Sequence, residues 1–199
     1  MMLIEETAVP QAALPLAEFK THLRLGSGFA DDDIQDPVLE SFLRAAISAI
    51  EARTGKILIE RSFSWTFVSW RDASGQAMPV APVVQITSLT LRNHDDEEEL
   101  IDPAHYVLEK DAHRPILRPI GSVLPGIPSG GTAELAFVAG MAINWAGLPA
   151  DMGQSVLLLA AHYYENRNDS AMGDASMPFG VAGLIERYRT VRLLGGGRG

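Results

Sequence analysis

The densest group of potentially reactive side chains lies between residues 94 and 99. His94 is followed by five carboxylates, Asp95–Glu99, and His105 lies a few residues further on. A divalent metal ion held by such groups could activate a water molecule, so a small metal-dependent hydrolase that uses this cluster is one hypothesis. Five adjacent carboxylates cannot all face one ion, and an exposed, solvated hairpin tip is the interpretation that we favour.

The other groups of reactive residues fit structural roles better. Asp31–Asp33 precede a helix, where carboxylates complement the free N–H groups and the helix dipole. His162 and Glu165 lie three residues apart, but their order is the reverse of the Glu-then-His motif of di-iron bundles, and no second copy exists. Neither a nucleophile elbow nor a phosphate-binding glycine loop occurs. We therefore expect no catalytic residue, no cofactor and no metal.

The length and composition are those of a folded protein of one domain, or at most of a core with appendages. Its 199 residues are 47% hydrophobic and 21% charged, and there is no cysteine for a disulfide or a thiolate nucleophile. Sixteen basic and 25 acidic residues give a net charge of −9, which disfavours a protein that grips nucleic acid over its whole surface. The N-terminus does not read as a signal peptide, and the apolar runs are too short to span a bilayer, so we expect no membrane association.

The C-terminal end carries the opposite charge. Four arginines occur there against the single acid Glu186, and they accompany two leucines. One interpretation is a frayed, soluble end. The other is a docking segment, with the leucines as apolar anchors and the arginines paired with acids on a partner. The residues of this candidate segment are Arg187, Tyr188, Arg189, Arg192, Leu193, Leu194 and Arg198.

The periodicity of the apolar residues indicates both helices and strands. It predicts helices over residues 14–25, 37–54 and 149–167 and a last short helix near 181–188. In the second helix Asp36 is the expected N-cap, Pro37 the first helical residue and Gly55 the stop. The expected strands cover residues 62–67, 84–91, 106–109, 115–118 and 132–139.

Strands grouped between helices favour an α+β fold over a doubly wound parallel sheet. We expect a mostly helical subunit of about four helices with a central set of about five short antiparallel strands. Residues 1–182 would form the core, with the helices around a β region at 57–140, and residues 183–199 would form the C-terminal docking tail.

Six segments in a fixed order carry a resemblance to known proteins. They are Leu16–Leu25 with Asp31–Asp33, Ala45–Gly55, Pro82–Leu89, Phe137–Gly140, Leu148–Arg167 and Pro178–Arg189. Their order and spacing resemble the phage head–tail connector (adaptor) family, which includes the adaptors of gene-transfer-agent particles. The insertion Gly173–Met177 and the acidic run at 95–99 are not features of that family.

The resemblance implies a non-enzymatic ring, typically of twelve copies, beneath the portal protein at the capsid vertex. Such a ring joins the portal to the next neck component, a head-closure or stopper protein, and lets DNA pass through its lumen without specific binding. The C-terminal segment would reach into the portal. The protein would be made in the bacterial cytoplasm and would reside in the neck of a virion or phage-like particle.

The polar side of the predicted helix at 37–54 could serve pairing between subunits of this ring. Its charged residues, which carry both signs, are Glu40, Arg44, Glu51 and Arg53. A solvated helix face is the alternative, and the sequence leaves both open.

Overall fold

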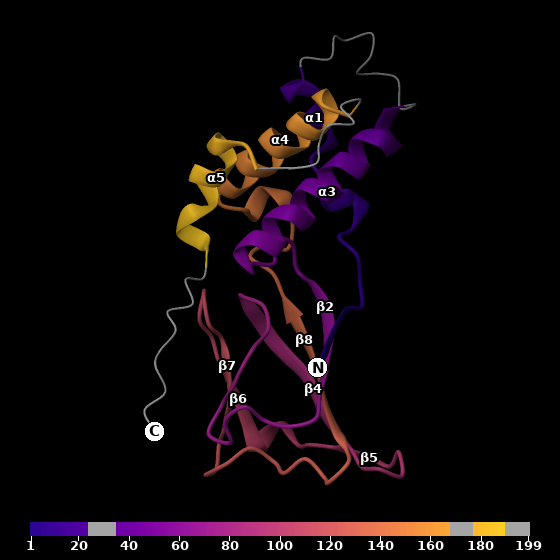
Figure 1. The fold of residues 1–199 in the computed structure, drawn as a ribbon, viewed down its shortest axis with the longest axis vertical. Coiled ribbons are helices and arrows are strands. Elements are labelled where there is room, and N and C mark those ends of the chain that lie inside the picture. The colour runs from indigo at the N-terminus through magenta and orange to yellow at the C-terminus, as the bar shows by residue number, and fades with distance from the viewer. Residues whose placement is uncertain (24–34, 168–176, 190–199) are drawn as a thin grey trace.

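The computed structural model describes residues 1–23, 35–167 and 177–189, and it places the helices and the strands at opposite ends of the molecule (Figure 1). The helices are α1 (Leu16–His22), α3 (Asp36–Thr54), α4 (Ala150–Glu165) and α5 (Phe179–Ile185), and a 3-10 turn at Glu186–Tyr188 follows α5. The strands are β1 (Met2–Glu5), β2 (Arg61–Phe67), β3 (Gln76–Ala77), β4 (Val83–Arg92), β5 (Glu98–Leu100), β6 (Tyr106–Glu109), β7 (Ile116–Pro119) and β8 (Thr132–Ala139). The expected α+β class with antiparallel strands is confirmed.

The longest helix, α3, forms because apolar residues recur along one side of it. Leu39, Leu43 and Ile50 are fully buried there, and Gly55 ends the helix with a positive φ of 69° while its N–H donates to the carbonyl of Glu51. The expected N-cap at Asp36 is wrong by one position. Gln35 is the capping residue, and Asp36 is already helical, with its carboxylate 2.6 Å from the Lys20 ammonium of α1.

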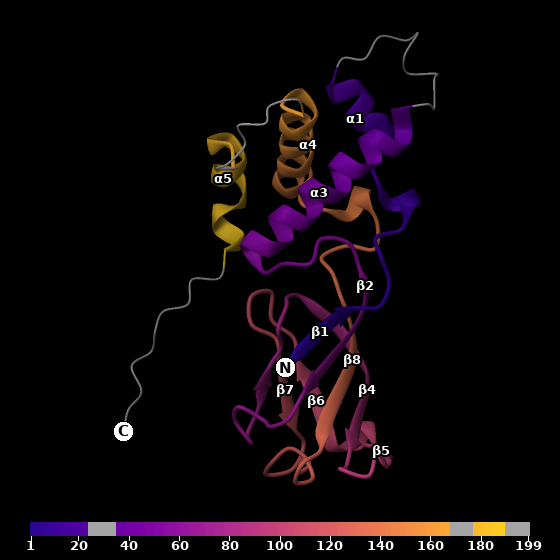
Figure 2. The ribbon, with the colours of Figure 1, turned by 45° about the vertical axis from the view of Figure 1, so that its right-hand side comes forward.

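The helices form a layer in which α4 is the central element. Both α3 and α5 pack on α4, and Figure 2 shows α5 on one side of α4 and α1 with the upper half of α3 on the other. Val181 and Ile185 of α5 are buried in this core together with Met152 and Val156 of α4. The described helices include none that is long and apolar enough to cross a membrane.

The strands form two sheets that enclose a second core. The larger sheet has the order β1-β2-β8-β4-β5 and the smaller one the order β3-β7-β6, with antiparallel pairing throughout. The period of two in β2 buries Phe63, Trp65 and Phe67 against Leu117 and other residues of the smaller sheet. The polar residues between them point to the opposite face.

The sequence predicts the bounds of β6 and β8 correctly but misses β1, β3 and β5. β3 and β5 have two and three residues, which is too short for an alternating pattern to be recognised, and the four residues of β1 are all exposed and do not alternate. In addition, β5 contains Glu98 and Glu99, and glutamate is depleted in strands. Their pairing with longer neighbours, and not their own sequence, makes them strands.

Candidate functional site: charged contacts at the joint and at the C-terminal segment

A buried arginine ties the helical layer to the larger sheet. Arg61, the first residue of β2, has a side chain that is only 5% exposed. Its Nη2 lies 2.6 Å from Oε2 of Glu51 on α3, and its Nε lies 2.7 Å from Oε1 of Glu5 on β1. Glu51 also accepts a hydrogen bond from the backbone N–H of Leu58 at 2.8 Å. The consecutive elements α3 and β2 and the N-terminal strand β1 therefore meet at one guanidinium.

The positive charge of Arg61, at this joint between the helical layer and the larger sheet, is compensated by carboxylates of the same chain. Burial opposes the charged form of Arg61, but hydrogen bonds to Glu51 and Glu5 outweigh it and raise the pKa of the guanidinium. The arginine therefore remains charged at any physiological pH. A buried charge with two carboxylate partners stabilises a fixed geometry and is not a catalytic arrangement.

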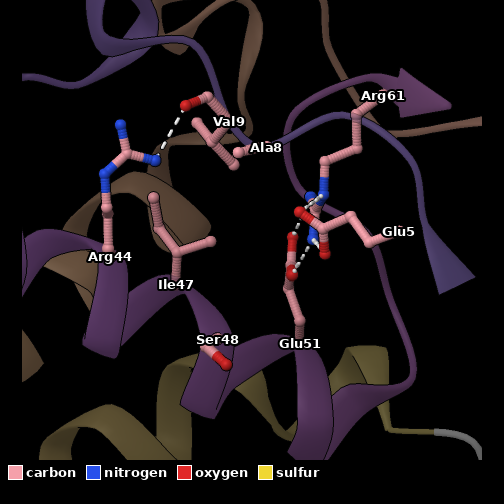
Figure 3. Close-up of a pocket in the computed structure, with 8 residues that line it drawn as sticks. All are labelled: Glu5, Ala8, Val9, Arg44, Ile47, Ser48, Glu51 and Arg61. Carbon is pink, nitrogen blue, oxygen red and sulfur yellow. Dashed lines mark hydrogen bonds and ion pairs between the residues drawn. The ribbon is translucent and has the colours of Figure 1, made fainter.

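A pocket of about 200 Å³, open to solvent, lies beside this joint (Figure 3). Its lining residues are Glu5, Ala8, Val9, Arg44, Ile47, Ser48, Glu51 and Arg61. Arg44 donates to the carbonyl of Val9 at 2.8 Å and to Glu40 at 2.7 Å, so both arginines of the pocket already have partners inside the chain. The pocket is thus the place where the N-terminal segment is tied to α3.

These contacts change the expected set of solvent-facing charges on α3. Glu51 is only 8% exposed and is committed to Arg61, so its expected place on a solvent-facing side of the helix is wrong. Glu40 and Arg44 pair with each other, four residues apart. The Arg53 side chain is exposed and makes no ion pair or hydrogen bond within the described residues. A role of Glu40, Arg44 and Arg53 in subunit pairing stays a prediction.

The first residues of the expected docking tail are held by the body of the protein. Asp151, in the first turn of α4, accepts a hydrogen bond from the Tyr188 hydroxyl at 2.8 Å and forms an ion pair with Arg187 at 2.7 Å. The guanidinium of Arg187 also lies over the ring of Tyr188 and donates to its hydroxyl. Partial burial raises the pKa of Tyr188, so its hydroxyl stays protonated and continues to donate to Asp151.

The expected boundary between core and tail at residues 182 and 183 therefore falls inside α5. Ile185 is fully buried in the helical core, and Arg189 pairs with Glu186 at 3.0 Å. The helical body extends at least to Tyr188. The remaining predicted docking residues, Arg192, Leu193, Leu194 and Arg198, lie outside the described residues, as does Asp31–Asp33.

The acidic run at 94–99 forms a hairpin between β4 and β5. The Asn93 side chain accepts hydrogen bonds from the N–H groups of Asp95 and Glu97, and Arg92 pairs with Glu98 at 2.5 Å across the hairpin. The side chains are exposed and spread along the turn. Within the described residues no group of three or more histidine and acidic side chains is arranged to hold a metal ion. The geometry gives the hydrolase hypothesis no support.

The sequence analysis did not identify Arg61 or Asp151 as residues of this site, although the strand pattern around Arg61 could have indicated its burial. Arg61 lies two residues before Phe63 and four before Trp65, and alternate residues of a strand face the same side. The strand pattern therefore already places Arg61 on the buried face of β2. A buried arginine requires an acidic partner. The tertiary fold decides which acids pair with Arg61. It also decides that Asp151 contacts Tyr188, which lies 37 residues further along the chain.

Comparisons with known proteins agree with a structural role for the charged contacts described above. No family model matches the sequence, and no curated protein matches it. A chain in the neck of an empty gene transfer agent (GTA) particle, computed with C6 symmetry, is 52% identical, with 98% of this chain and 99% of that chain covered and a TM-score of 0.89. A chain in the virion of a native GTA particle is also 52% identical over the same shares, with a TM-score of 0.87.

A third solved structure, the neck of a native GTA particle computed with C12 symmetry, contains a chain that is 47% identical, with 98% of this chain and 99% of that chain covered and a TM-score of 0.83. The fold and these matches define the class of protein, which is a structural component of the neck of a phage-like particle. The chain belongs to the family of neck (adaptor) proteins of gene transfer agent particles. The resemblance seen in the sequence is thereby confirmed.

Proposed function

We propose that the protein is a connector subunit in the neck of a gene transfer agent particle, where it joins the head to the tail. The observation that carries this proposal is the 52% identity over 98% of the chain to a protein of such a neck. At this identity, and with a TM-score of 0.89, the two chains share one fold over nearly their whole length. We propose no catalytic step for it.

The assembled form is a ring of twelve copies around the particle axis. The neck structures that contain the matched chains were computed with C6 and C12 symmetry, which supports a cyclic assembly of this chain. A closed ring with head-to-tail contacts requires each subunit to present two different, complementary faces. DNA would cross the lumen of this ring.

The partners along the axis are the portal protein on the head side and a head-closure or stopper protein on the tail side. The support for portal docking is the charge of the C-terminal end, where four arginines contrast with the net charge of −9 of the whole chain. Arg187 and Arg189 pair with Asp151 and Glu186, so we assign the docking charge mainly to Arg192 and Arg198. Such a cationic segment is suited to acidic grooves. The anionic remainder repels phosphates, so DNA passes without adhering.

Deletion of the gene in a producing strain tests this function directly. The expected result is tailless heads and loss of gene transfer of at least about tenfold, because no other component would bridge head and tail. Complementation with the wild-type gene restores tailed particles. Particles that keep their tails and transfer DNA without the protein would overturn the proposal.

A further inference from the structure

The solvent-facing side of α3 carries a stripe of uncharged residues, which are small except for the exposed Val38. At successive spacings of three and four positions, the exposed residues Val38, Ser41, Ala45, Ser48 and Ala52 lie opposite the buried side of the helix. This spacing places them in one straight row, the arrangement seen where two helices pack closely. The charged neighbours Glu40, Arg44 and Glu51 instead face the chain's own contacts. We call this row the α3 stripe.

The outer side of α5 has a different character. Phe179 is 93% exposed, and Gly180 and Gly183 lie next to it on the exposed side of the helix. A Cβ atom added to either glycine would meet nothing within 4 Å, so no packing inside the chain requires these glycines, although glycine weakens a helix relative to alanine. Their backbone is open to close approach by another molecule. Phe179, Gly180 and Gly183 form what we call the α5 face.

Both surfaces belong to one helical layer, in which α4 packs against α3 and against α5 (Figure 2). Resting on the proposed function, we propose that in the ring the α5 face of one copy packs on the α3 stripe of the next copy. The occupant of each surface is therefore a second copy of this chain. The two surfaces differ, as a head-to-tail contact demands.

Shape and charge support this pairing. A large exposed aromatic side chain is the kind of residue that anchors protein interfaces, and a row of small residues gives it room. The Arg53 side chain, which has no ion pair within the described residues, lies at the C-terminal end of α3. Glu186, which follows α5, pairs with Arg189 at 3.0 Å, but its side chain is 63% exposed and can still be approached by a second cation. A parallel arrangement of the two helices brings this cation and this carboxylate to the same end of the contact.

Disulfide cross-linking in assembled particles tests the contact, because the chain contains no cysteine. Gly183→Cys is combined in turn with Ala45→Cys, Ser48→Cys or Ala52→Cys, so that at least one pair reaches bonding distance. Oxidation of at least one double variant should give a ladder of covalent oligomers, and each single variant should stay monomeric. The control pair Gly183→Cys with Thr87→Cys, on the exposed side of β4, should give no ladder.

Substitution provides a second measurement. Ala45→Arg places a long charged side chain in the α3 stripe, and Phe179→Ala removes the aromatic anchor from the α5 face. Each should lower the yield of tailed particles at least about tenfold while the circular dichroism spectrum and melting temperature of the purified protein stay unchanged. The control Thr87→Arg, which adds the same side chain at an exposed position elsewhere, should leave the yield unchanged.

The results separate this inference from the proposed function. If gene deletion removes tails but both substitutions assemble normally and no double variant cross-links, the contact is refuted and the connector function stands. If gene deletion leaves tailed particles, the proposed function itself fails, and this inference fails with it.

Discussion

Arg61 shows how a single residue can couple two layers of a protein. Its guanidinium contacts Glu51 from the helical layer and Glu5 from the larger sheet, and all of these groups are satisfied only when both layers are in place. The contact therefore stabilises the relative orientation of the helices and strands. In a ring, that orientation would decide where each end of the subunit lies.

We predict that Arg61→Met lowers the free energy of unfolding by about 3–5 kcal/mol, because it leaves the Glu51 carboxylate buried without a cation. Urea unfolding followed by circular dichroism measures this change. The double variant Arg61→Met with Glu51→Gln removes the charges of both Arg61 and Glu51, keeps an acceptor for the N–H of Leu58, and should recover most of the loss. Equal instability of the single and double variants would show that packing, and not the charge pair, is responsible.

Lys56 presents the opposite case of a buried charge without a hydrogen-bond partner. Its residue is 1% exposed, and no acceptor within the described residues contacts its Nζ. Burial lowers its pKa from the usual 10.5, and the nearby Asp111 opposes the shift only in part. The folded protein therefore releases this proton more easily than the unfolded chain does.

We predict that Lys56→Met raises the free energy of unfolding at neutral pH by about 1–3 kcal/mol. The penalty in the wild type is fully present below the lowered pKa and disappears as pH rises from that pKa towards 10.5, so the advantage of the variant should shrink over this range. Thermal unfolding at a series of pH values measures it. Lys110→Met, at an exposed lysine, serves as the control and should change little; a pH-independent advantage of Lys56→Met would contradict the explanation.

At the scale of elements, α5 and the turn that follows it form the root of the C-terminal segment. Val181 and Ile185 anchor α5 in the helical core, and Asp151 holds Tyr188 and Arg187. The docking function that we propose for the C-terminal end therefore starts from a fixed point on the body. Truncations on either side of residue 189 should then have different effects.

We predict that deletion of residues 190–199 leaves the melting temperature within about 2 °C of the wild type, because the buried part of α5 remains. The same deletion should abolish attachment to the portal, measured by pull-down with the purified portal protein. Deletion of residues 186–199 removes the contacts to Asp151 as well and should also lower the melting temperature. A 190–199 deletion that binds portal like the wild type would contradict the docking role.

At the scale of the whole molecule, charge is distributed unevenly along the chain. The 25 acidic residues outnumber the 16 basic ones, yet the last 13 residues contain four arginines and no acid. This uneven distribution of charged residues gives the chain an anionic body and a cationic C-terminal end. Electrostatic attraction between that end and an acidic groove would be screened by salt.

We predict that Arg189→Glu combined with Arg192→Glu weakens binding to the portal at least about tenfold at low salt. Binding of the wild type should itself fall as the salt concentration rises from about 50 to 500 mM, whereas the variant should show a smaller salt dependence. Surface plasmon resonance with immobilised portal measures both. Wild-type binding that does not change with salt would remove electrostatics from the docking mechanism.

The sequence predicted the α+β class, the long helix from Asp36 and the strands β2 and β8, because the apolar periods of these elements are long or regular enough to be recognised. The resemblance to head–tail connectors could also be read from segments spread along the chain. The short strands could not be predicted, since pairing with a neighbour defines them. Glu51 was placed on the wrong side because a helical period cannot reveal that a charge is buried against an arginine of the following strand.

The sequence by itself determined which residues alternate, which recur with a helical period and that the C-terminal end is cationic, because these properties depend only on residue order. Only the tertiary structure decided that Glu51 and Arg61 form a buried pair, that Asp151 holds Tyr188, and that the exposed side of α3 is small and uncharged. Each of these depends on contacts between different elements or on what covers a helix. Such contacts are set by the packing of whole layers.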